Sequence, residues 1–417
     1  MIVVLGRLLN IRPHEWPRLL ILYLMSFIVL TGINWGETIV EADFLRQIGV
    51  QYLPWAFIIN ATCSIMAIFI YSAFADRVSN DRILIALLAI SVIGIVIGLL
   101  LLAAGAVLIA FPLFYLILNV PLLDIYNVHW ATYISSFYDT RAAKRVIPIL
   151  GTSARLAGIV AGLTMPLLNQ HLAPTGIIGL WIGALVVMAL LAWFMPRLLH
   201  EKTAPSALNP IPAQPRPSAR ENLREGSAYI RQSIFLRWMA VSTLLFTVLL
   251  ALINYRTSSI LLSQLKTTTA MADFVGLVSG VTNLIALPIQ LFLVGRVIGW
   301  FGLGNANLIF PTGTLLISGS LMFFPGLASA ALGYFNRTTF RTSFRNSTEN
   351  LLYNAVPLRV KGRARAFISG LIVPIGAILG SAILLLTPLL RASGAADRVL
   401  VGAMGILALT FVAVAVV

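Results

Sequence analysis

Four charged residues recur at every fourth position in one stretch of the chain: Arg337, Arg341, Arg345 and Glu349. Residues four apart lie on the same face of an α-helix, so these side chains are expected to form one slowly turning stripe. The planar donor fork of arginine matches the oxygens of carboxylate and phosphate groups. The spacing therefore predicts an anion-binding site or, for Arg345 and Glu349, a structural ion pair across one helical turn.

Further ionisable residues stand alone in apolar stretches. Asp124 and Arg155 are predicted to pair, either as a structural tie or as part of a substrate or proton-coupling site. His129, a little more than one helical turn after Asp124, either joins them as a proton relay or is a hydrogen-bonded bystander. The single cysteine, Cys63, excludes a disulfide framework and a CxxC motif. The sequence contains no metal cluster, nucleophile–base pair, Walker loop or dinucleotide fingerprint, so we expect no catalytic residue, metal or cofactor.

The composition shows what surrounds these residues. Of the 417 residues, 59% are hydrophobic and 10% are charged, against about 25% charged in an average soluble domain. The mean hydropathy is +0.94. These values exclude a soluble enzyme, a nucleic-acid-binding protein and a disordered chain. They indicate an all-α membrane protein, in which a charge inside a span costs at least about 2.5–3.5 kcal/mol and is therefore paired or functional.

Long apolar runs predict twelve transmembrane helices, each of about 20 residues or more. The predicted spans are 18–40, 52–75, 83–104, 107–136, 146–169, 175–196, 236–262, 271–295, 303–324, 326–353, 364–390 and 398–417. Residues 197–233 separate two sets of six spans and are predicted to form a cytoplasmic Pro-rich linker with a surface helix. The predicted domains are therefore an N-terminal six-helix bundle, 1–196, this linker, and a C-terminal six-helix bundle, 234–417.

The basic residues are distributed unequally over the predicted loops. Of the 29 Lys and Arg residues, 20 fall on the side that holds the linker and 4 on the other. Cytoplasmic loops carry the excess of Lys and Arg, so both termini are predicted to be cytoplasmic, in the inner (plasma) membrane of the cell. The net charge of +15 is therefore mostly a signal of topology and not of nucleic acid as a partner. The other five lie inside predicted spans: Arg155, Arg256, Arg337, Arg341 and Arg345.

The two sets of spans resemble each other. The motif Ile-Asn-Trp at 33–35 in the first span matches Ile-Asn-Tyr at 253–255 in the seventh. A GxxxG pair at 158–162 in the fifth span matches one at 376–380 in the eleventh, and such pairs let helices approach closely. A six-plus-six duplication is an architecture of secondary transporters.

With these features, the sequence resembles the major facilitator superfamily. Residues Ala75–Arg82 (ADRVSNDR) are similar to its Asp-Arg loop motif, with the leading Gly lost. Phe137–Gly151 (FYDTRAAKRVIPILG) and Glu349–Tyr353 resemble the ADP/ATP translocase family and its bacterial relatives. The resemblance implies two six-helix bundles with pseudo-two-fold symmetry. Where nucleotide-exchanging members carry basic residues in and after the first span, this chain has Glu37, Glu41 and Asp43.

We therefore expect a secondary active membrane transporter, working by alternating access on an organic anion such as a nucleotide or another phosphorylated metabolite. The alternative is a non-transporting membrane scaffold or sensor that keeps the transporter fold. The expected partners are the small anionic substrate and the lipid bilayer, and a monomer is expected, although the sequence does not determine the oligomeric state. Exchange by an antiporter and proton symport both stay open. The predicted substrate-binding residues are Arg337, Arg341, Arg256, Asp124 and Arg155. The predicted gating residues are Glu37, Arg256, Asp76, Arg77, Arg345 and Glu349.

Glu37 and Arg256 are predicted to form an outer gate. The matched motifs place them one residue apart in register, and both lie about 20 residues into their spans, in the outer half. The resemblance implies that the first and seventh spans approach each other on that side. Because burying two separate charges costs several kcal/mol each, the acid and the base are expected to pair in one state and to be hydrated in the other. In the alternative, Glu37 faces a hydrated vestibule with Glu41 and Asp43.

A double-mutant experiment tests this gate. Glu37→Gln and Arg256→Gln should each favour the outward-open form, and the double variant should add little, because either change alone already breaks the pair. The measurement is the reaction of engineered cysteines with a membrane-impermeant reagent. Fully additive effects on accessibility would show that the two residues act independently.

Overall fold

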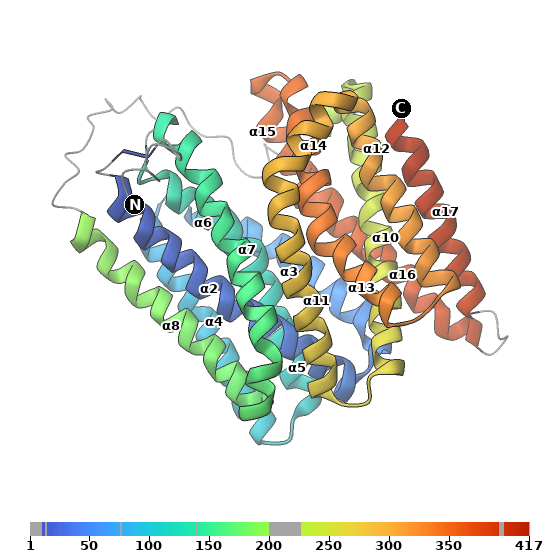
Figure 1. Cartoon of the computed structure of the whole chain (residues 1–417), viewed down its shortest axis with the longest axis horizontal. Coiled ribbons are helices and arrows are strands. Elements are labelled where there is room, and N and C mark those ends of the chain that lie inside the picture. The colour runs from blue at the N-terminus through green and yellow to red at the C-terminus, as the bar shows by residue number, and fades with distance from the viewer. Residues whose placement is uncertain are drawn as a thin grey trace. The chain divides into compact units, whose positions relative to one another are not determined.

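The computed structural model describes residues 11–12, 15–75, 77–138, 140–199, 227–391 and 396–416. Helices make up almost all of these residues, and no β-strand occurs among them (Figure 1). The prediction of an all-α protein is confirmed.

The helices of the N-terminal half follow one another with short turns. They are α2 (Trp16–Asp43), the π-helical η2 (Phe44–Ile48), the 3₁₀-helical η3 (Val50–Tyr52), α3 (Leu53–Phe74), α4 (Asn80–Ala103), α5 (Val107–Ile117), the π-helical η4 (Leu118–Ile125), α6 (Tyr126–Ser135), α7 (Thr140–His171) and α8 (Pro174–Leu199). The π-helical η4 joins α5 directly to α6, so these three elements form one span.

The C-terminal half begins with a short helix at 227–232. The remaining elements are α10 (Ile234–Gln264), α11 (Thr268–Pro288), η5 (Ile289–Leu293), α12 (Val294–Phe323), α13 (Leu327–Phe335), η6 (Asn336–Arg345), α14 (Asn346–Leu352), η7 (Tyr353–Ala355), α15 (Leu358–Phe367), η8 (Ile368–Ile372), α16 (Val373–Arg391) and α17 (Ala396–Val416). Of these, η5, η6 and η8 are π-helical and η7 is a 3₁₀-helix.

Ten segments of the described chain are long and apolar enough to cross a membrane. One of them, Thr268–Phe323, contains 56 residues and is broken at Gly302, whose φ of 74° lies in the left-handed region that glycine adopts readily. It therefore forms two spans. A further span, from α13 through η6 to α14, holds three arginines and so is less apolar than the others. Together these segments give the twelve spans that the sequence predicts.

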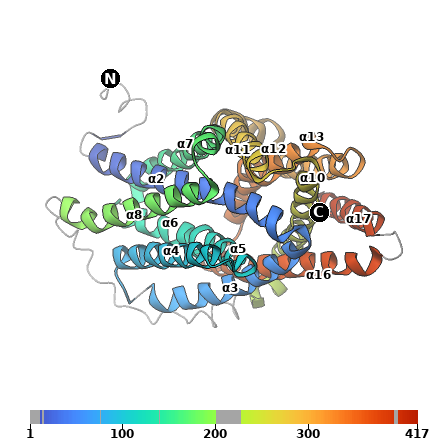
Figure 2. The same cartoon turned by 90° about the horizontal axis from the view of Figure 1, so that it is seen from below.

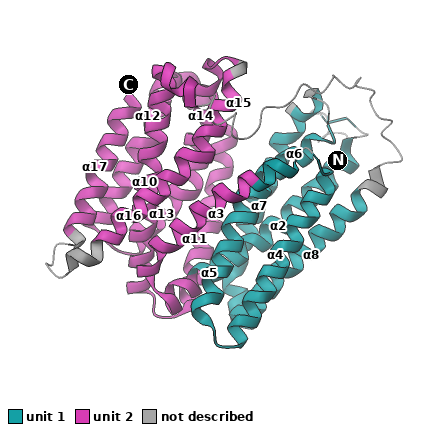
Figure 3. Cartoon of the chain, turned by 180° about the vertical axis from the view of Figure 1, so that it is seen from behind, with its two compact units in different colours: residues 1–41, 70–216 teal, residues 42–69, 217–417 magenta. Residues whose placement is uncertain are grey.

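The chain divides into two compact units, coloured separately in Figure 3. The first contains residues 1–41 and 70–216, and the second contains residues 42–69 and 217–417. The end of the first span and most of the second span thus group with the C-terminal spans. Most of the predicted linker, from residue 200 to 226, lies outside the described residues, and the bundle boundaries predicted from sequence stay a prediction.

Within the first unit, α2 packs against both α7 and α8. Figure 2 shows α2 and α8 running alongside each other, and the ring of Trp181 occupies the space that a side chain at Gly36 would need. Toward α7, the indole Nε1 of Trp35 donates to Thr164 Oγ1 at 3.2 Å, and Ser153 Oγ donates to Ser26 Oγ at 2.8 Å. The first span is therefore tied to the fifth and sixth.

Within the second unit, the equivalent spans make equivalent contacts. A Cβ added at Gly380 on α16 would lie 2.8 Å from Ala251 Cβ and 2.9 Å from the Val248 carbonyl oxygen, both on α10. The seventh and eleventh spans thus approach as closely as a glycine permits. The rings of Phe246 on α10 and Phe411 on α17 lie 5.7 Å apart, which joins the seventh span to the twelfth. Each unit therefore repeats the same helix pairing, as the duplicated motifs predict.

Candidate substrate and gating site

The centre of the candidate site is η6, a π-helical stretch of ten residues within the tenth span. One face of η6 is buried and polar. Thr314 Oγ1 donates to Asn336 Oδ1 at 3.0 Å, and Thr339 Oγ1 donates to the Thr282 carbonyl at 2.6 Å. These bonds fix η6 against α12 and α11. The three arginines of η6 are less buried than Asn336 and Thr339.

Arg345 is held in a cage of aromatic rings and is only 12% exposed. Its guanidinium carbon lies 4.5 Å from the ring centre of Phe246, 5.6 Å from that of Phe411 and 5.9 Å from that of Phe310. A cation over aromatic faces is attracted by their quadrupoles. Because the three rings belong to α10, α17 and α12, this one side chain joins the tenth span to three others.

Two polar contacts complete the surroundings of Arg345. Its Nη2 donates to Thr243 Oγ1 at 3.1 Å, and its Nε lies 3.7 Å from Glu349 Oε2. The ion pair between Arg345 and Glu349, which the spacing of the sequence allows, is therefore present. A gating role for either residue stays a prediction.

Arg341 and Arg337 follow Arg345 along the same stripe. The guanidinium carbon of Arg341 lies 5.7 Å from the Phe246 ring centre, so Arg341 and Arg345 share one ring. That of Arg337 lies 4.6 Å from the ring centre of Tyr334. Both side chains are half-buried. Three guanidinium groups thus stand in sequence along one face of η6, as the four-residue spacing predicts.

Arg256 belongs to the same unit as the stripe. Its Nε donates to the Leu321 carbonyl oxygen at a distance of 3.4 Å, which links α10 to α12. Glu37 is half-buried on α2 and belongs to the first unit. The predicted pair between Glu37 and Arg256 stays a prediction.

The first unit contains the other predicted substrate residues. Asp124 is exposed on η4, although it lies within the fourth span, and Arg155 is half-buried on α7. Their pairing stays a prediction. Both η4 and η6 are π-helical and lie in the middle of equivalent spans, the fourth and the tenth. With eight and ten residues they are longer than η2, η5 and η8, which have five each. Asp124, Arg337 and Arg341 therefore share one structural context.

The side chain of His129 is held in place by two hydrogen bonds. It is fully buried, with Nε2 at 2.8 Å from the Asn80 carbonyl oxygen and Nδ1 at 3.1 Å from the Tyr71 hydroxyl. The carbonyl can only accept, so Nε2 carries a proton, and a neutral ring then accepts at Nδ1 from the tyrosine. The contacts join α6 to both ends of the turn between α3 and α4. Of the predicted gating residues in that turn, Arg77 is exposed and Asp76 lies outside the described residues.

Sequence reasoning missed two features of this arrangement. Glu15 and Arg145 form an ion pair at 2.9 Å between the starts of α2 and α7. Near this pair, burial raises the pKa of the Tyr138 hydroxyl to about 12, while the charge of Arg18 lowers it and that of Glu15 raises it by smaller amounts. The only sequence signal was an acid directly before the first span. The aromatic cage of Arg345 gave no signal, because phenylalanines in apolar spans are ordinary.

The whole fold is similar to that of solved membrane transporters. The crystal structure of the nucleoside transporter NupG has a TM-score of 0.68 at 13% identity and covers 95% of this chain and 98% of that one. A bacterial homologue of the iron transporter ferroportin gives 0.67 at 14%, covering 95% and 98%, and the POT family transporter PepTSo gives 0.63 at 16%, covering 96% and 98%. These likenesses establish the major facilitator fold.

The family follows from the sequence itself. The model of the TLC ATP/ADP transporter family matches residues 95–339, which is more than half of the chain. The chain belongs to this family, and it is a multi-pass membrane transporter and not an enzyme. No curated protein matches the chain closely enough to count as a relative.

The aromatic cage leads to a prediction about stability. Arg345→Lys keeps the charge but loses the planar group that faces the three rings, so we expect the free energy of unfolding in detergent to fall by about 1–2 kcal/mol. The same substitution at Arg398, which is exposed near the start of α17, is the control and should change little. Equal effects at the two positions would contradict the role of the cage.

Proposed function

We propose that this transporter moves an organic anion, a nucleotide or another phosphorylated metabolite, by secondary active transport with alternating access. The observation that carries the proposal is the stripe on η6. Three guanidinium groups and one carboxylate lie along it, and that carboxylate, Glu349, pairs with Arg345 at its inner end. Arg337 and Arg341 are half-buried along the same stripe, and each carries a planar donor fork of the shape that phosphate oxygens accept.

The family description supports an anion of the nucleotide class, because the family takes that description from ATP/ADP transport. In this chain the first span carries acids, Glu37 and Glu41, where nucleotide exchangers carry basic residues. We therefore propose that arginines of the second unit bind the phosphate, with Arg256 as a further hydrogen-bond donor. Transport by exchange and by proton symport are both compatible with this site.

In the first unit, Asp124 and Arg155 are proposed as further substrate-binding residues. An ionised carboxylate within a membrane span destabilises the protein unless water or a polar partner solvates it. Asp124 is a carboxylate of this kind, exposed within the fourth span. π-Helical turns within α-helices are frequently found at functional sites, and Asp124 occupies a π-helical stretch in the span equivalent to that of Arg337 and Arg341. We assign to Asp124 contact with hydroxyl or amino groups of the substrate, and to Arg155 the orientation of that carboxylate.

Substitutions on the stripe test the substrate site. Arg341→Lys should weaken substrate binding about tenfold although the charge is kept, because the bidentate fork is lost. Arg337→Gln and Arg341→Gln should weaken it further. The measurement is uptake into proteoliposomes from a panel of nucleotides, sugar phosphates and dicarboxylates, with Arg398→Lys as the matched control. Unchanged affinity in both Gln variants would remove these residues from the site.

We further propose that both termini face the cytoplasm in the plasma membrane. The excess of Lys and Arg on one side of the predicted topology supports this orientation. In a Cys63→Ser background, Pro215→Cys should react with an impermeant maleimide only after the membrane is opened. Lys266→Cys, in the turn between α10 and α11, should react in intact cells. Labelling of position 215 from outside the cell would contradict the proposed orientation of the chain in the membrane.

A further inference from the structure

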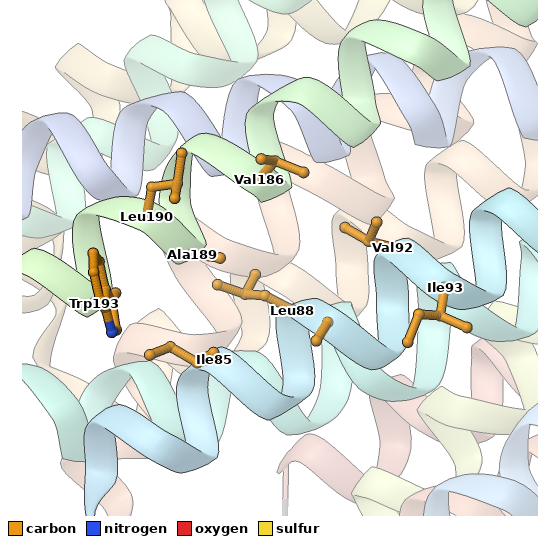
Figure 4. A pocket seen from close by; sticks show the side chains of 9 residues that line it. Ile85, Leu88, Val92, Ile93, Val186, Ala189, Leu190 and Trp193 are labelled. Carbon is orange, nitrogen blue, oxygen red and sulfur yellow. The ribbon is translucent and has the colours of Figure 1, made fainter.

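A pocket of about 360 Å³ lies between α4 and α8 in the first unit (Figure 4). Every residue that lines it is hydrophobic. Ile85 and Ile93 mark its extent along α4, and Val186 and Trp193 mark it along α8. Ile93 is 59% exposed and Trp193 is 49% exposed, so the pocket is an open groove on the outer surface of the unit.

The depth of the groove in the membrane follows from the two helices that form it. Both α4 and α8 are membrane spans, so the groove opens to the hydrocarbon layer. From Ile85 to Ile93 the helix advances by eight residues, a rise of about 12 Å at 1.5 Å per residue. One leaflet contributes roughly 15 Å of the hydrocarbon core. The groove therefore begins near one end of α4, which starts at Asn80, and runs through most of one leaflet.

The size of the groove identifies the shape of its occupant. A helix is about 10 Å wide and would lie over a groove of about 360 Å³ between two neighbouring helices without filling it. A narrow, flexible, wholly apolar chain fits, and the acyl chains of lipids are the molecules of that form in the surrounding layer.

The end of the groove also carries a charge. Arg82 is exposed and lies three residues before Ile85, on the same face of α4 one turn nearer the helix start. Trp193 lines the groove at the same end, and tryptophan is enriched where a membrane meets water. A guanidinium group at that level is complementary to a lipid phosphate. The apolar groove and the cation at its end are therefore placed as the acyl chain and the headgroup of a lipid would be.

We propose that the α4–α8 groove binds one acyl chain of an anionic phospholipid, whose phosphate group contacts Arg82. Anionic lipid is favoured over zwitterionic lipid because the choline or ethanolamine cation of the latter is repelled by the same guanidinium group. The site lies wholly within the first unit, and it does not depend on the proposed substrate.

Lipid retention by the purified full-length protein tests the proposal. Native mass spectrometry would compare phosphatidylglycerol with phosphatidylcholine of identical acyl chains, and with soluble glycerol phosphate. Wild type should retain one phosphatidylglycerol about tenfold more strongly than phosphatidylcholine, and should not retain glycerol phosphate. Arg82→Gln should abolish the preference while some retention of both lipids persists, and Arg296→Gln, an exposed arginine on α12, should not.

A second pair of variants tests the groove itself. Ala89→Phe places a ring inside the groove and should remove retention of both lipids, whereas Ala103→Phe, at the far end of α4, should leave it unchanged. Wild-type retention in Ala89→Phe would overturn the proposal. So would a dimer of wild type that Ala89→Phe dissolves, because that result would assign the groove to a second copy.

Fluorescence supplies a test that does not depend on a variant with a filled groove. Phosphatidylglycerol brominated on its acyl chains should quench tryptophan fluorescence of wild type more than brominated phosphatidylcholine at the same fraction. Trp193→Phe should remove that difference, although seven of the eight tryptophans remain. Equal quenching by the two lipids in wild type would contradict a preference for the anionic headgroup.

Discussion

A guanidinium group inside a membrane span is the physical constraint around which the second unit is built. An unpaired charge at that depth destabilises the fold by several kcal/mol, and Arg345 is only 12% exposed. Its surroundings offset this cost with three aromatic rings, one hydroxyl and one carboxylate. Because these groups come from α10, α12, α17 and the next turn of its own span, the cage fixes four elements together.

The packing of the second unit brings those elements close enough to Arg345 to form the cage. Phe246 must reach Arg345 from α10, and α10 in turn is held against α16 by the close approach at Gly376 and Gly380. The helix η6 is also held by hydrogen bonds, from Thr314 on α12 to Asn336 and from Thr339 to the Thr282 carbonyl on α11. Buried polar groups that are satisfied in this way fix one helix rotation. The rotation decides that Arg337 and Arg341 lie on the stripe and not in the packed face.

The sequence specifies the parts of this arrangement that depend on single spans. Twenty-residue apolar runs give the spans, and the break before the ninth span occurs at Gly302, where the chain adopts a positive φ. The four-residue spacing of the arginines gives their common face. What it does not specify is contact between distant segments. His129 bonds to Tyr71 and Asn80, and Arg345 meets Phe310 and Phe411, through helix rotations that packing sets and no local pattern records.

The π-helical winding explains why the stripe stays aligned over four positions. In an α-helix, which has 3.6 residues per turn, each fourth residue overshoots a full turn. A π-helix has a wider turn, because its bonds join residues five apart, so each fourth residue falls short of one. From Arg337 to Arg345 the winding is π-helical, and from Arg345 to Glu349 it is α-helical. The two drifts therefore have opposite sense and partly cancel.

The same winding occurs in the equivalent span of the first unit, where η4 contains Asp124 but no arginine. The duplicated halves have thus kept the helix geometry and diverged in charge, one presenting a carboxylate and the other guanidinium groups. The helix geometry at this position of the span is therefore independent of the sign of the charge that it carries.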